Sequence, residues 1–442
     1  MHAQLSRPPG PDHEVSEIMS PFLPDSLTGI ASDFHDATNR NLLERWQPLC
    51  DWLDTRLRDG FDPACKVNTV RIGARALAQD RRGRMLSGVN LASLDPLNIS
   101  THPKVLAATQ DAAARFGIHS AGSAAMMGLT SLVVTLEQRM ATFLSMRDAL
   151  VFPTGADALH ALFRTLVQPG DHIILDSLAA PGLRDLAEIA TRKVHLAHHL
   201  SPASVLDHLE KIRAQEPDAG ILVMMEAMSY ADCQSPDLVT LQEMCRLHEA
   251  TLLVDTALDL GSTGPGGRGV LGLQGLLGEV DLVSGTFARA FASNGGFLAC
   301  NHPALRTAIV QGSLVHWSSC AISPLQAAAI LAALDLIDGM EGDWRRRCLL
   351  RNCRAFRQGL AKQGYNVLGE PGSAIPVLLG AAAVARRMTA EVLYHGAVVN
   401  LLEYPIVPQG GARWMLHPMA DHSAEDVDTF LALTERARRF AV

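Results

Sequence analysis

The stretch VDLVSGTFARAFASNGG, residues 280–296, decides the fold class together with the segment GGFLAC that overlaps its end at residues 295–300. A short, mostly apolar run leads into a Ser-Gly-Thr turn, and a second apolar run begins after a pair of glycines. Apolar runs of this length, bounded by turns, are typical of strands buried inside a sheet. The stretch therefore indicates two core strands joined by a loop that carries polar residues.

The same pattern recurs upstream of this stretch. The further runs are DALVFPTG (148–155), DHIILD (171–176), KVHLAHH (193–199), GILVMME (220–226) and ATLLVDTA (250–257). Most are followed by a turn and a stretch with helical periodicity, which predicts an α/β fold with a mainly parallel central sheet. Ligand sites of such sheets lie at the carboxyl ends of the strands.

Three regions are expected along the 442 residues. Residues 1–85 are interpreted as an N-terminal arm and helix, because the first 25 residues are rich in proline and polar side chains. Apolar residues from Leu42 to Leu57 then recur at helical spacing, and this stripe must dock on the body or on a partner subunit. Residues 86–305 form the predicted large α/β domain, and residues 306–442 a smaller C-terminal α+β domain.

Composition excludes several classes of function. The net charge is −8 and no basic run is present, so nucleic acid is not an expected partner. No stretch reaches the roughly 18 apolar residues of a membrane span, and no secretory leader is visible, which predicts a cytoplasmic protein. The eight cysteines lack paired or metal-type spacing, so we expect reduced thiols and no metal site.

The order of segments resembles that of a known enzyme family. The segments are SGVNLASLDPLNISTHPKV (87–105), HSAGSAAMMGLTSLVVTLEQRMATF (119–143), ALVFPTGADAL (149–159), LLVDTALDLGSTGPGGRGV (252–270), VDLVSGTFARAFASNGG (280–296) and YPIVPQGGARWMLHP (404–418). They are similar to the α-oxoamine synthases, which include serine palmitoyltransferase and 8-amino-7-oxononanoate synthase. The resemblance implies the aspartate aminotransferase-like fold of pyridoxal-phosphate (PLP) enzymes of fold-type I.

The resemblance also singles out Arg289. The segment GTFARAF reads GTFSKAF or similar in the family, where its lysine forms the Schiff base with PLP. A guanidinium stays protonated and cannot act as an imine-forming amine. From this substitution we predict that no cofactor is covalently bound and that PLP is not present as an internal aldimine. Arg289 itself is either an anion clamp or a plug that neutralises Asp255.

Other family positions are partly lost and partly kept. The two family histidines that contact the cofactor ring correspond to Ala180 and Leu258, and two further family positions to Pro96 and Ala124. The retained positions imply a remnant PLP pocket made of Thr154, Gly155, Asp255 and Thr286. Arg413 matches the family arginine that binds the substrate carboxylate.

Without a Schiff base, a histidine could supply the general base. His119 and His316 lie in segments that border the family's acyl pocket, so both are candidate catalytic residues beside Arg289. A structural or solvated role is the commoner one for each. Cys320 is a candidate acyl acceptor, although a packing thiol is the commoner reading.

Two main hypotheses of function follow, with a narrower third. The first is a divergent acyltransferase that takes an acyl group from acyl-CoA or an acyl-carrier protein and passes it to a small-molecule acceptor, as a homodimer in a biosynthetic pathway. The second is a non-catalytic subunit that supports a lysine-bearing synthase. The third is noncovalent use of PLP or its amine form.

Overall fold

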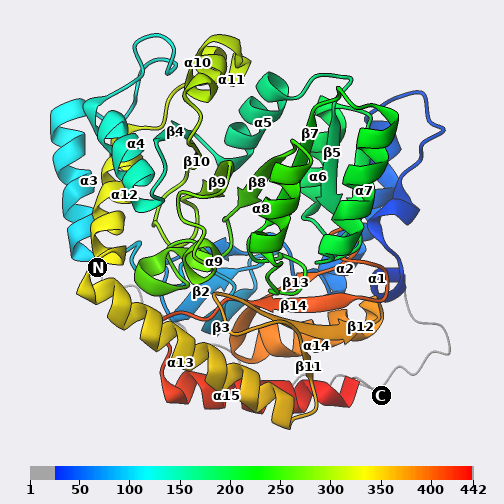
Figure 1. The fold of residues 1–442 in the computed structure, drawn as a ribbon. Coiled ribbons are helices and arrows are strands. Elements are labelled where there is room, and N and C mark those ends of the chain that lie inside the picture. Colours follow the sequence, from blue (N-terminus) through cyan, green and yellow to red (C-terminus); the bar gives the residue numbers. More distant parts are fainter. Residues whose placement is uncertain (1–24, 441–442) are drawn as a thin grey trace.

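The computed structural model describes residues 25–440 and contains two seven-stranded sheets (Figure 1). The larger sheet has the order β4-β10-β9-β8-β7-β5-β6. Its strands are β4 (Asp148–Phe152), β5 (His172–Asp176), β6 (Val194–Ala197), β7 (Ile221–Glu226), β8 (Thr251–Asp255), β9 (Leu282–Thr286) and β10 (Gly296–Cys300). Strands β5, β6, β7, β8 and β9 are parallel to one another. Strand β10 is antiparallel to both of its neighbours, β9 and β4. The fold-type I architecture predicted from the sequence is confirmed.

The apolar runs become strands because both faces of the larger sheet are covered by helices. All five residues of β5 are buried, as are all five of β10, so these strands need apolar side chains on both faces. One face packs against α3 (Pro103–Phe116), α4 (Ser131–Phe143), α7 (Pro202–Gln215), α8 (Leu238–Leu247) and α12 (Pro324–Ile337). The other packs against α5 (Gly155–Leu166), α6 (Pro181–Ala190) and α10 (Pro303–Gly312).

The smaller sheet combines segments from both ends of the chain. Its order is β1-β2-β3-β13-β14-β12-β11. The strands are β1 (Val67–Asn68), β2 (Arg75–Gln79), β3 (Met85–Leu91), β11 (Asn366–Val367), β12 (Ile375–Gly380), β13 (Ala397–Leu402) and β14 (Ala412–Leu416). β3 pairs in parallel with β13, so the small domain is not confined to residues 306–442 as predicted. No local pattern in either segment indicates a pairing between strands about 300 residues apart.

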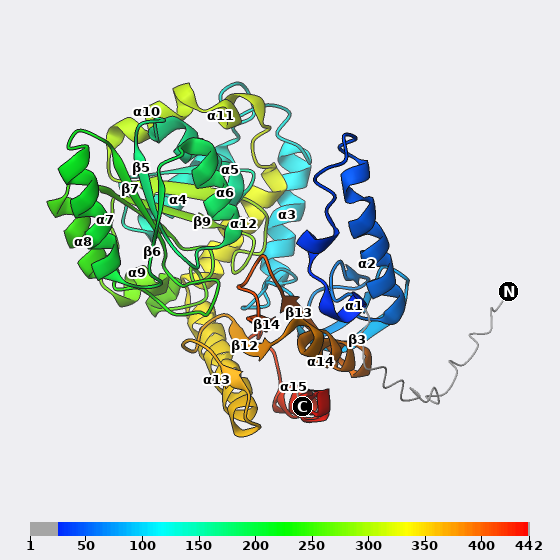
Figure 2. The ribbon, with the colours of Figure 1, turned by 90° about the vertical axis from the view of Figure 1, so that its right-hand side faces the viewer.

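The N-terminal helix begins later in the chain than the start of the apolar stripe at Leu42, which was expected to be helical throughout. α2 spans Gln47–Asp59, and Figure 2 shows it beside α1 (Asp25–Thr28), on the side of the molecule away from α7 and α8. Trp52 is buried, whereas Leu43 and Trp46 are exposed, so only the later part of the stripe docks on this chain. The proposed arm of residues 1–24 lies outside the described residues.

The remaining helices join and cover the two domains. They are α9 (Gly269–Leu273), α11 (Leu314–Ser318), α13 (Met340–Lys362), α14 (Ala382–His395) and α15 (Ala424–Ala437). α13 runs from the larger domain beneath the smaller one, where α15 lies beside it (Figure 1). Within residues 25–440, no helix has the length and apolar character that crossing a membrane requires. All eight cysteines are free thiols.

Candidate functional site

A cavity of about 340 Å³ opens at the carboxyl ends of the parallel strands β7, β8 and β9. Its volume falls within the range of small-molecule sites in proteins. The lining residues come from the starts of α5 and α6 and from the ends of these strands; they are Gly155, Ala156, Leu159, Ala180, Gly182, Leu183, Leu186, Glu226, Tyr230, Asp255, Ala257, Leu258, Gly285, Thr286 and Arg289. The cavity thus lies where α/β sheets bind ligands.

The N-terminus of α5 forms one wall of this cavity. Thr154 caps the helix, because its Oγ1 accepts a hydrogen bond of 3.0 Å from the backbone N–H of Asp157. The first N–H groups of a helix have no partner inside the helix and attract anions. A Cβ on Gly155 would lie 3.3 Å from the Cβ of Thr286, so glycine lets the helix start pack closely on β9. The Thr286 hydroxyl itself donates to the carbonyl oxygen of Gly295 at 3.0 Å.

Two carboxyl groups lie side by side at the ends of neighbouring strands. Glu226 of β7 and Asp255 of β8 are partners in the parallel register. Asp255 accepts hydrogen bonds from Ser284 Oγ at 2.7 Å and from the N–H of Ala257 at 3.0 Å, yet burial raises its pKa. Burial and, second, the charge of Asp255 raise the pKa of Glu226 to about 8. Glu226 is therefore poised to exchange a proton near neutral pH.

Arg289 brings a cation to the same cavity without a direct partner. Among residues 25–440 it makes neither a hydrogen bond nor an ion pair, and its guanidinium carbon lies 6.0 Å from the centre of the Tyr230 ring. Burial lowers its pKa, while Tyr230, Cys233, Asp255 and Glu226 act in the opposite direction. A guanidinium remains charged in spite of such a shift. Arg289 forms no ion pair with Asp255 among the described residues, yet its positive charge counteracts the rise that burial causes in the pKa of Asp255. The anion clamp and the plug that neutralises Asp255 both stay predictions.

The structure gathers most of the positions that the resemblance singled out. Gly155, Asp255, Thr286 and Arg289 line the cavity, and so do Ala180 and Leu258, the positions at which the resemblance implied two histidines of the family. The cavity wall at these two positions is apolar, because neither side chain carries a polar group.

Arg413 lies outside the lining of this cavity. It is buried, and it donates to two carbonyl oxygens, through Nε to Gly411 at 2.9 Å and through Nη1 to Ala231 at 2.5 Å. Its Nη2 has no partner among the described residues. Ala231 follows Tyr230 on the loop after β7, so Arg413 supports the segment that covers Arg289.

Neither candidate histidine lines the cavity. His119 is exposed on the loop between α3 and α4. His316 is buried in α11, where burial and then the charge of Arg306 lower its pKa. Both stay predictions. Cys320, which pairs as an isolated bridge with Ser123, is exposed.

Three polar residues near Arg289 were missed in the sequence. Glu226 and Tyr230 line the cavity, and burial followed by the charge of Arg289 lowers the pKa of His417 to about 3, which keeps that imidazole neutral. The signal for Glu226 was visible, since it ends the run GILVMME on a predicted strand. Tyr230 and His417 follow their strands in loops, and nothing local indicated that they turn inward.

Comparison with known proteins agrees with this geometry. Residues 87–432 match the family model described as aminotransferase class I and II. The 8-amino-7-oxononanoate synthase of Pectobacterium atrosepticum is 30% identical over 351 residues, which are 79% of this chain and 89% of that protein. This chain is a member of the α-oxoamine synthase family. A putative 8-amino-7-oxononanoate synthase 2 of Mycobacterium tuberculosis is 32% identical over 76% of this chain, but the match spans only 42% of that longer protein.

Solved structures give the same result. A serine palmitoyltransferase from S. paucimobilis, a lysine-to-alanine variant with a bound PLP-myriocin aldimine, has a TM-score of 0.84 and 26% identity, covering 91% of this chain and 99% of its own. The enzyme from Sphingomonas wittichii has a TM-score of 0.83 and 27% identity over the same shares. The α-oxoamine synthase fold therefore extends over nearly the whole chain.

These comparisons correct the prediction about the cofactor. A serine palmitoyltransferase structure with 26% identity is described with PLP as internal aldimine, and the lysine-to-alanine variant still holds PLP. The expectation that no cofactor is covalently bound and that PLP is not present as an internal aldimine is therefore contradicted by these homologues. It rested on the side chain at position 289 and on the loss of other family side chains, whereas the cavity keeps the helix terminus at Gly155 and the carboxyl group of Asp255. PLP is the cofactor to expect of this family.

Proposed function

We propose that this chain is a transferase of the α-oxoamine synthase type, which takes an acyl group from a thioester and passes it to a small-molecule acceptor bound beside PLP. The observation that carries the proposal is the cavity itself, which brings Gly155, Asp255, Thr286 and Arg289 together at the strand ends. Membership of the family supports the acyl thioester as the donor.

The residues present fit PLP on two sides. The N–H groups at the start of α5 would hold the phosphate, and Gly155 keeps that wall free of a side chain. The buried Asp255 carboxyl would face the pyridine nitrogen, as its position at the strand end allows. When bound, PLP supplies an electron sink for a carbanion on the acceptor. The apolar side chains of Ala180 and Leu258 would contact the pyridine ring of PLP.

Arg289 would stabilise negative charge that develops on the thioester carbonyl oxygen. A fixed cation that points into a cavity from which water is largely excluded stabilises an oxyanion more strongly than a solvated one does. Having no partner among residues 25–440, the guanidinium keeps its donors available for such an oxygen. Glu226, with a pKa of about 8, would accept or return a proton beside it. Arg413 would bind an acceptor carboxylate through its Nη2.

A second copy of the chain would complete the site. The loop that carries His119 exposes Ile118, Met126 and Met127, with Met127 89% exposed, and Leu314 beside His316 is 78% exposed. This loop and α11 are joined by a hydrogen bond of 3.1 Å from the N–H of Ala125 to the carbonyl oxygen of His316. Exposed apolar clusters mark protein interfaces. We therefore keep the homodimer and the candidate bases His119 and His316 as proposals that belong together.

Arginine at position 289 favours one alternative. A chain without an amine at this position would serve as a supporting subunit of a lysine-bearing synthase, and its own cavity would then turn nothing over. The alternative keeps the fold and the dimer surface but removes catalysis.

The test is to incubate the purified full-length chain with PLP, acyl thioesters and a panel of amino acids, and to follow thiol release and product masses. Release of thiol that depends on both PLP and an acceptor, and that falls at least tenfold in the Arg289→Gln variant, is expected. Thiol release unchanged in that variant would contradict the role of Arg289. No turnover by the chain alone, with turnover restored only by a lysine-bearing homologue, would establish the supporting subunit instead.

A further inference from the structure

Three neighbouring segments at the carboxyl edge of the larger sheet are joined by one histidine. His199 lies in the loop between β6 and α7, Asp176 ends β5, and Asp232 lies in the loop after β7. The Nδ1 of His199 lies 2.8 Å from a carboxylate oxygen of Asp176, and its Nε2 lies 3.1 Å from one of Asp232. Because β5 stands between β7 and β6 in the sheet, His199 spans the end of β5 and ties its own loop to the loop after β7.

Both partners of the His199 ring are carboxylates, which accept hydrogen bonds and donate none when ionised. Two such bonds therefore require a proton on each ring nitrogen. The hydrogen bonds to Asp176 and Asp232 raise the pKa of His199 to about 9, against the effect of burial. Burial acts to raise the pKa of both aspartates, but hydrogen bonds from His199 and from backbone N–H groups keep both values lowered. At neutral pH the bridge is thus a cation between two anions.

The Asp176 end of the bridge is fixed by backbone hydrogen bonds. Its Oδ1 also accepts a bond of 2.8 Å from the N–H of Leu178, and its Oδ2 accepts one of 2.7 Å from the N–H of Leu200. The loop after β5 leads to Ala180, which lines the cavity and whose N–H donates to Glu226 at 3.3 Å. The same carboxylate therefore fixes both the bridge and a wall of the cavity.

The Asp232 end of the bridge belongs to the loop of residues 229–234. Tyr230 of this loop lines the cavity at the strand ends. The carbonyl oxygen of Ala231 accepts a hydrogen bond of 2.5 Å from Nη1 of Arg413. The loop therefore carries one wall of the cavity and the carbonyl group that orients Arg413.

The loop faces the smaller domain on its other side. The N–H of Glu370, after β11, donates to the carbonyl oxygen of Cys233 at 3.3 Å. A side chain at Gly369 would collide with the carbonyl oxygen of Asp232, so the two segments touch through backbone atoms. The loop thus lies between the two domains, and His199 holds it from the side of the larger one.

The charge of His199 also affects Arg413. Burial lowers the pKa of Arg413, and the charge of Asp232 is the first of the influences that oppose this. Asp232 therefore attracts the guanidinium to which an acceptor carboxylate would bind. A protonated His199 neutralises Asp232, so less of the positive charge of Arg413 is offset.

We propose that His199 is a positioning residue for the acceptor site: its bridge between two aspartates holds residues 229–234 where they orient Arg413 toward an acceptor carboxylate. His199 is not among the residues that line the cavity, so it acts through the loop. The inference rests on the proposed function, in which Arg413 binds that carboxylate. Losing the bridge should weaken the acceptor site and leave the transfer step itself little changed.

Hydrogen exchange followed by mass spectrometry tests the bridge without any substrate. In His199→Gln at pH 7, the amides of residues 229–234 should exchange roughly tenfold faster than in the unaltered chain, because glutamine is no cation for the two carboxylates. Strand β10 should stay protected in both proteins over the same time. His199→Lys, which keeps a cation at this position, is the second variant and should restore most of the protection. Equal exchange of the loop in His199→Gln and the unaltered chain would overturn the inference.

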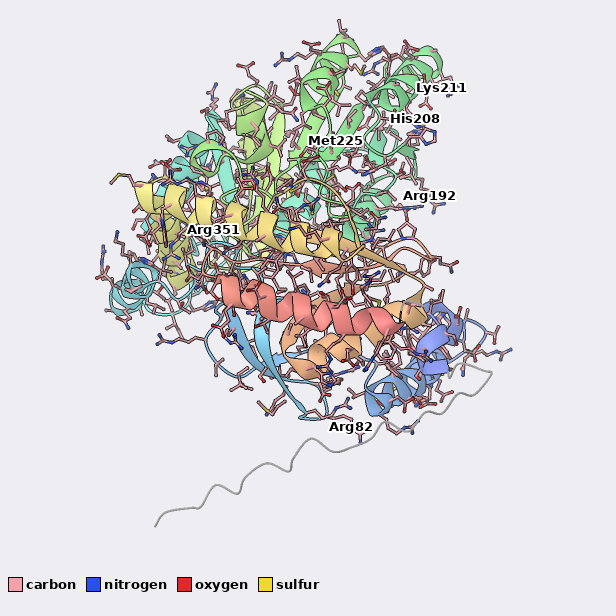
Figure 3. The ribbon with its side chains drawn as sticks, turned by 90° about the horizontal axis from the view of Figure 1, so that it is seen from below. Arg82, Arg192, His208, Lys211, Met225 and Arg351 are labelled. Atoms are coloured by element: carbon pink, nitrogen blue, oxygen red, sulfur yellow. The ribbon has the colours of Figure 1, made fainter. Side chains whose placement is uncertain are left out.

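Two controls match the change at His199. His198→Gln replaces the neighbouring histidine, which is exposed and whose side chain makes no hydrogen bond within residues 25–440. Lys211→Gln removes an exposed cation from α7, which Figure 3 shows at the outer edge of the larger domain. Both should exchange like the unaltered chain. Equally fast exchange of the loop in Lys211→Gln would overturn the inference, because the effect would then come from net charge.

Steady-state kinetics connects the loop with the acceptor site. In His199→Gln we expect the KM for the amino-acid acceptor to rise at least roughly fivefold, while kcat changes by less than about twofold. A loss of stability alone would lower the amount of active protein, and hence kcat, without changing KM. An unchanged KM together with faster exchange of residues 229–234 would overturn the positioning role.

A binding measurement separates this inference from the proposed function. Should none of the proteins transfer an acyl group, the affinity for the same amino acids is measured by calorimetry. Weaker binding by His199→Gln than by His198→Gln would then support the inference although the proposed function had failed. Equal binding by both variants would overturn the inference, whatever the outcome for acyl transfer.

Discussion

The two sides of the cavity at the strand ends differ in which atoms form them. The side at α5 consists of backbone, with a capped helix start packed against β9 and β10 through glycines. The side at Arg289 consists of side chains, among them those of Leu258, Ala180 and Arg289. The backbone that lines the cavity is held in place by the packing of the whole sheet, whereas a single substitution replaces a side chain. We therefore expect the backbone side, more than the side chain at position 289, to decide whether PLP binds in this cavity.

The largest expected effect comes from breaking the backbone side. A Cβ on Gly296 would lie 2.4 Å from the Cα of Gly155, so Gly296→Ala must displace the start of α5. We expect a loss of about 1–3 kcal/mol of stability and a roughly 10- to 100-fold loss of PLP affinity, measured by thermal melting and equilibrium dialysis. Gly170→Ala, at a glycine with open space around it, is the control and should leave both unchanged. Normal PLP binding by Gly296→Ala would refute the backbone cradle.

Replacing a side chain on the Arg289 side should affect acyl transfer more than PLP binding. Arg289→Gln removes the cation but leaves the α5 terminus intact, so PLP affinity should change by less than about threefold while thiol release falls roughly tenfold. Measuring both in one preparation tests the division between the two sides. A parallel loss of PLP binding would show that Arg289 holds the cofactor and not the acyl group.

Glu226 makes the stability of the folded chain depend on pH. Its pKa is raised from 4.5 to about 8 in the folded chain, so the protonated form is favoured by folding and stability falls as pH rises from about 4.5 to about 8. Thermal melting of Glu226→Gln should lack this decline and exceed the unaltered chain most clearly at pH 8. The same slope in both proteins would assign it to other groups.

A smaller effect on stability is expected outside the cavity, where His199 links the end of β5 to the loop after β7. Its Nδ1 lies 2.8 Å from Asp176 and its Nε2 lies 3.1 Å from Asp232, which together raise its pKa to about 9. The stabilisation is complete below pH 6.5 and is lost as pH rises through about 9. His199→Gln should cost roughly 1–2 kcal/mol at pH 7 and little at pH 10, as measured by denaturant unfolding. Equal cost at both values would mean that the charge plays no part.

Much of the fold was predictable because each core strand is a short apolar run that must be covered on both faces. The cluster of Asp255, Thr286 and Arg289 was predicted from the family resemblance, and it lies at the edge where the parallel strands β8 and β9 end. The pairing of β3 with β13 was not, because it joins distant segments. Nor could the sequence show which arginines of α13 lack partners, as Arg345 is paired partly by Asp421 from beyond β14. The prediction that PLP forms no internal aldimine was drawn from individual side chains, and it is contradicted by homologues that share the fold and hold PLP in that form.

The central claim, that the cavity remains a PLP site, is tested most directly by titrating PLP into the full-length chain and into Asp255→Asn. We predict saturable binding at one site per chain, with at least tenfold weaker affinity in the variant, because the buried carboxyl group would lose its interaction with the ring nitrogen. Asp428→Asn, at an exposed position on α15, should bind PLP like the unaltered chain. No saturable binding, or equal affinity in all three proteins, would contradict the account.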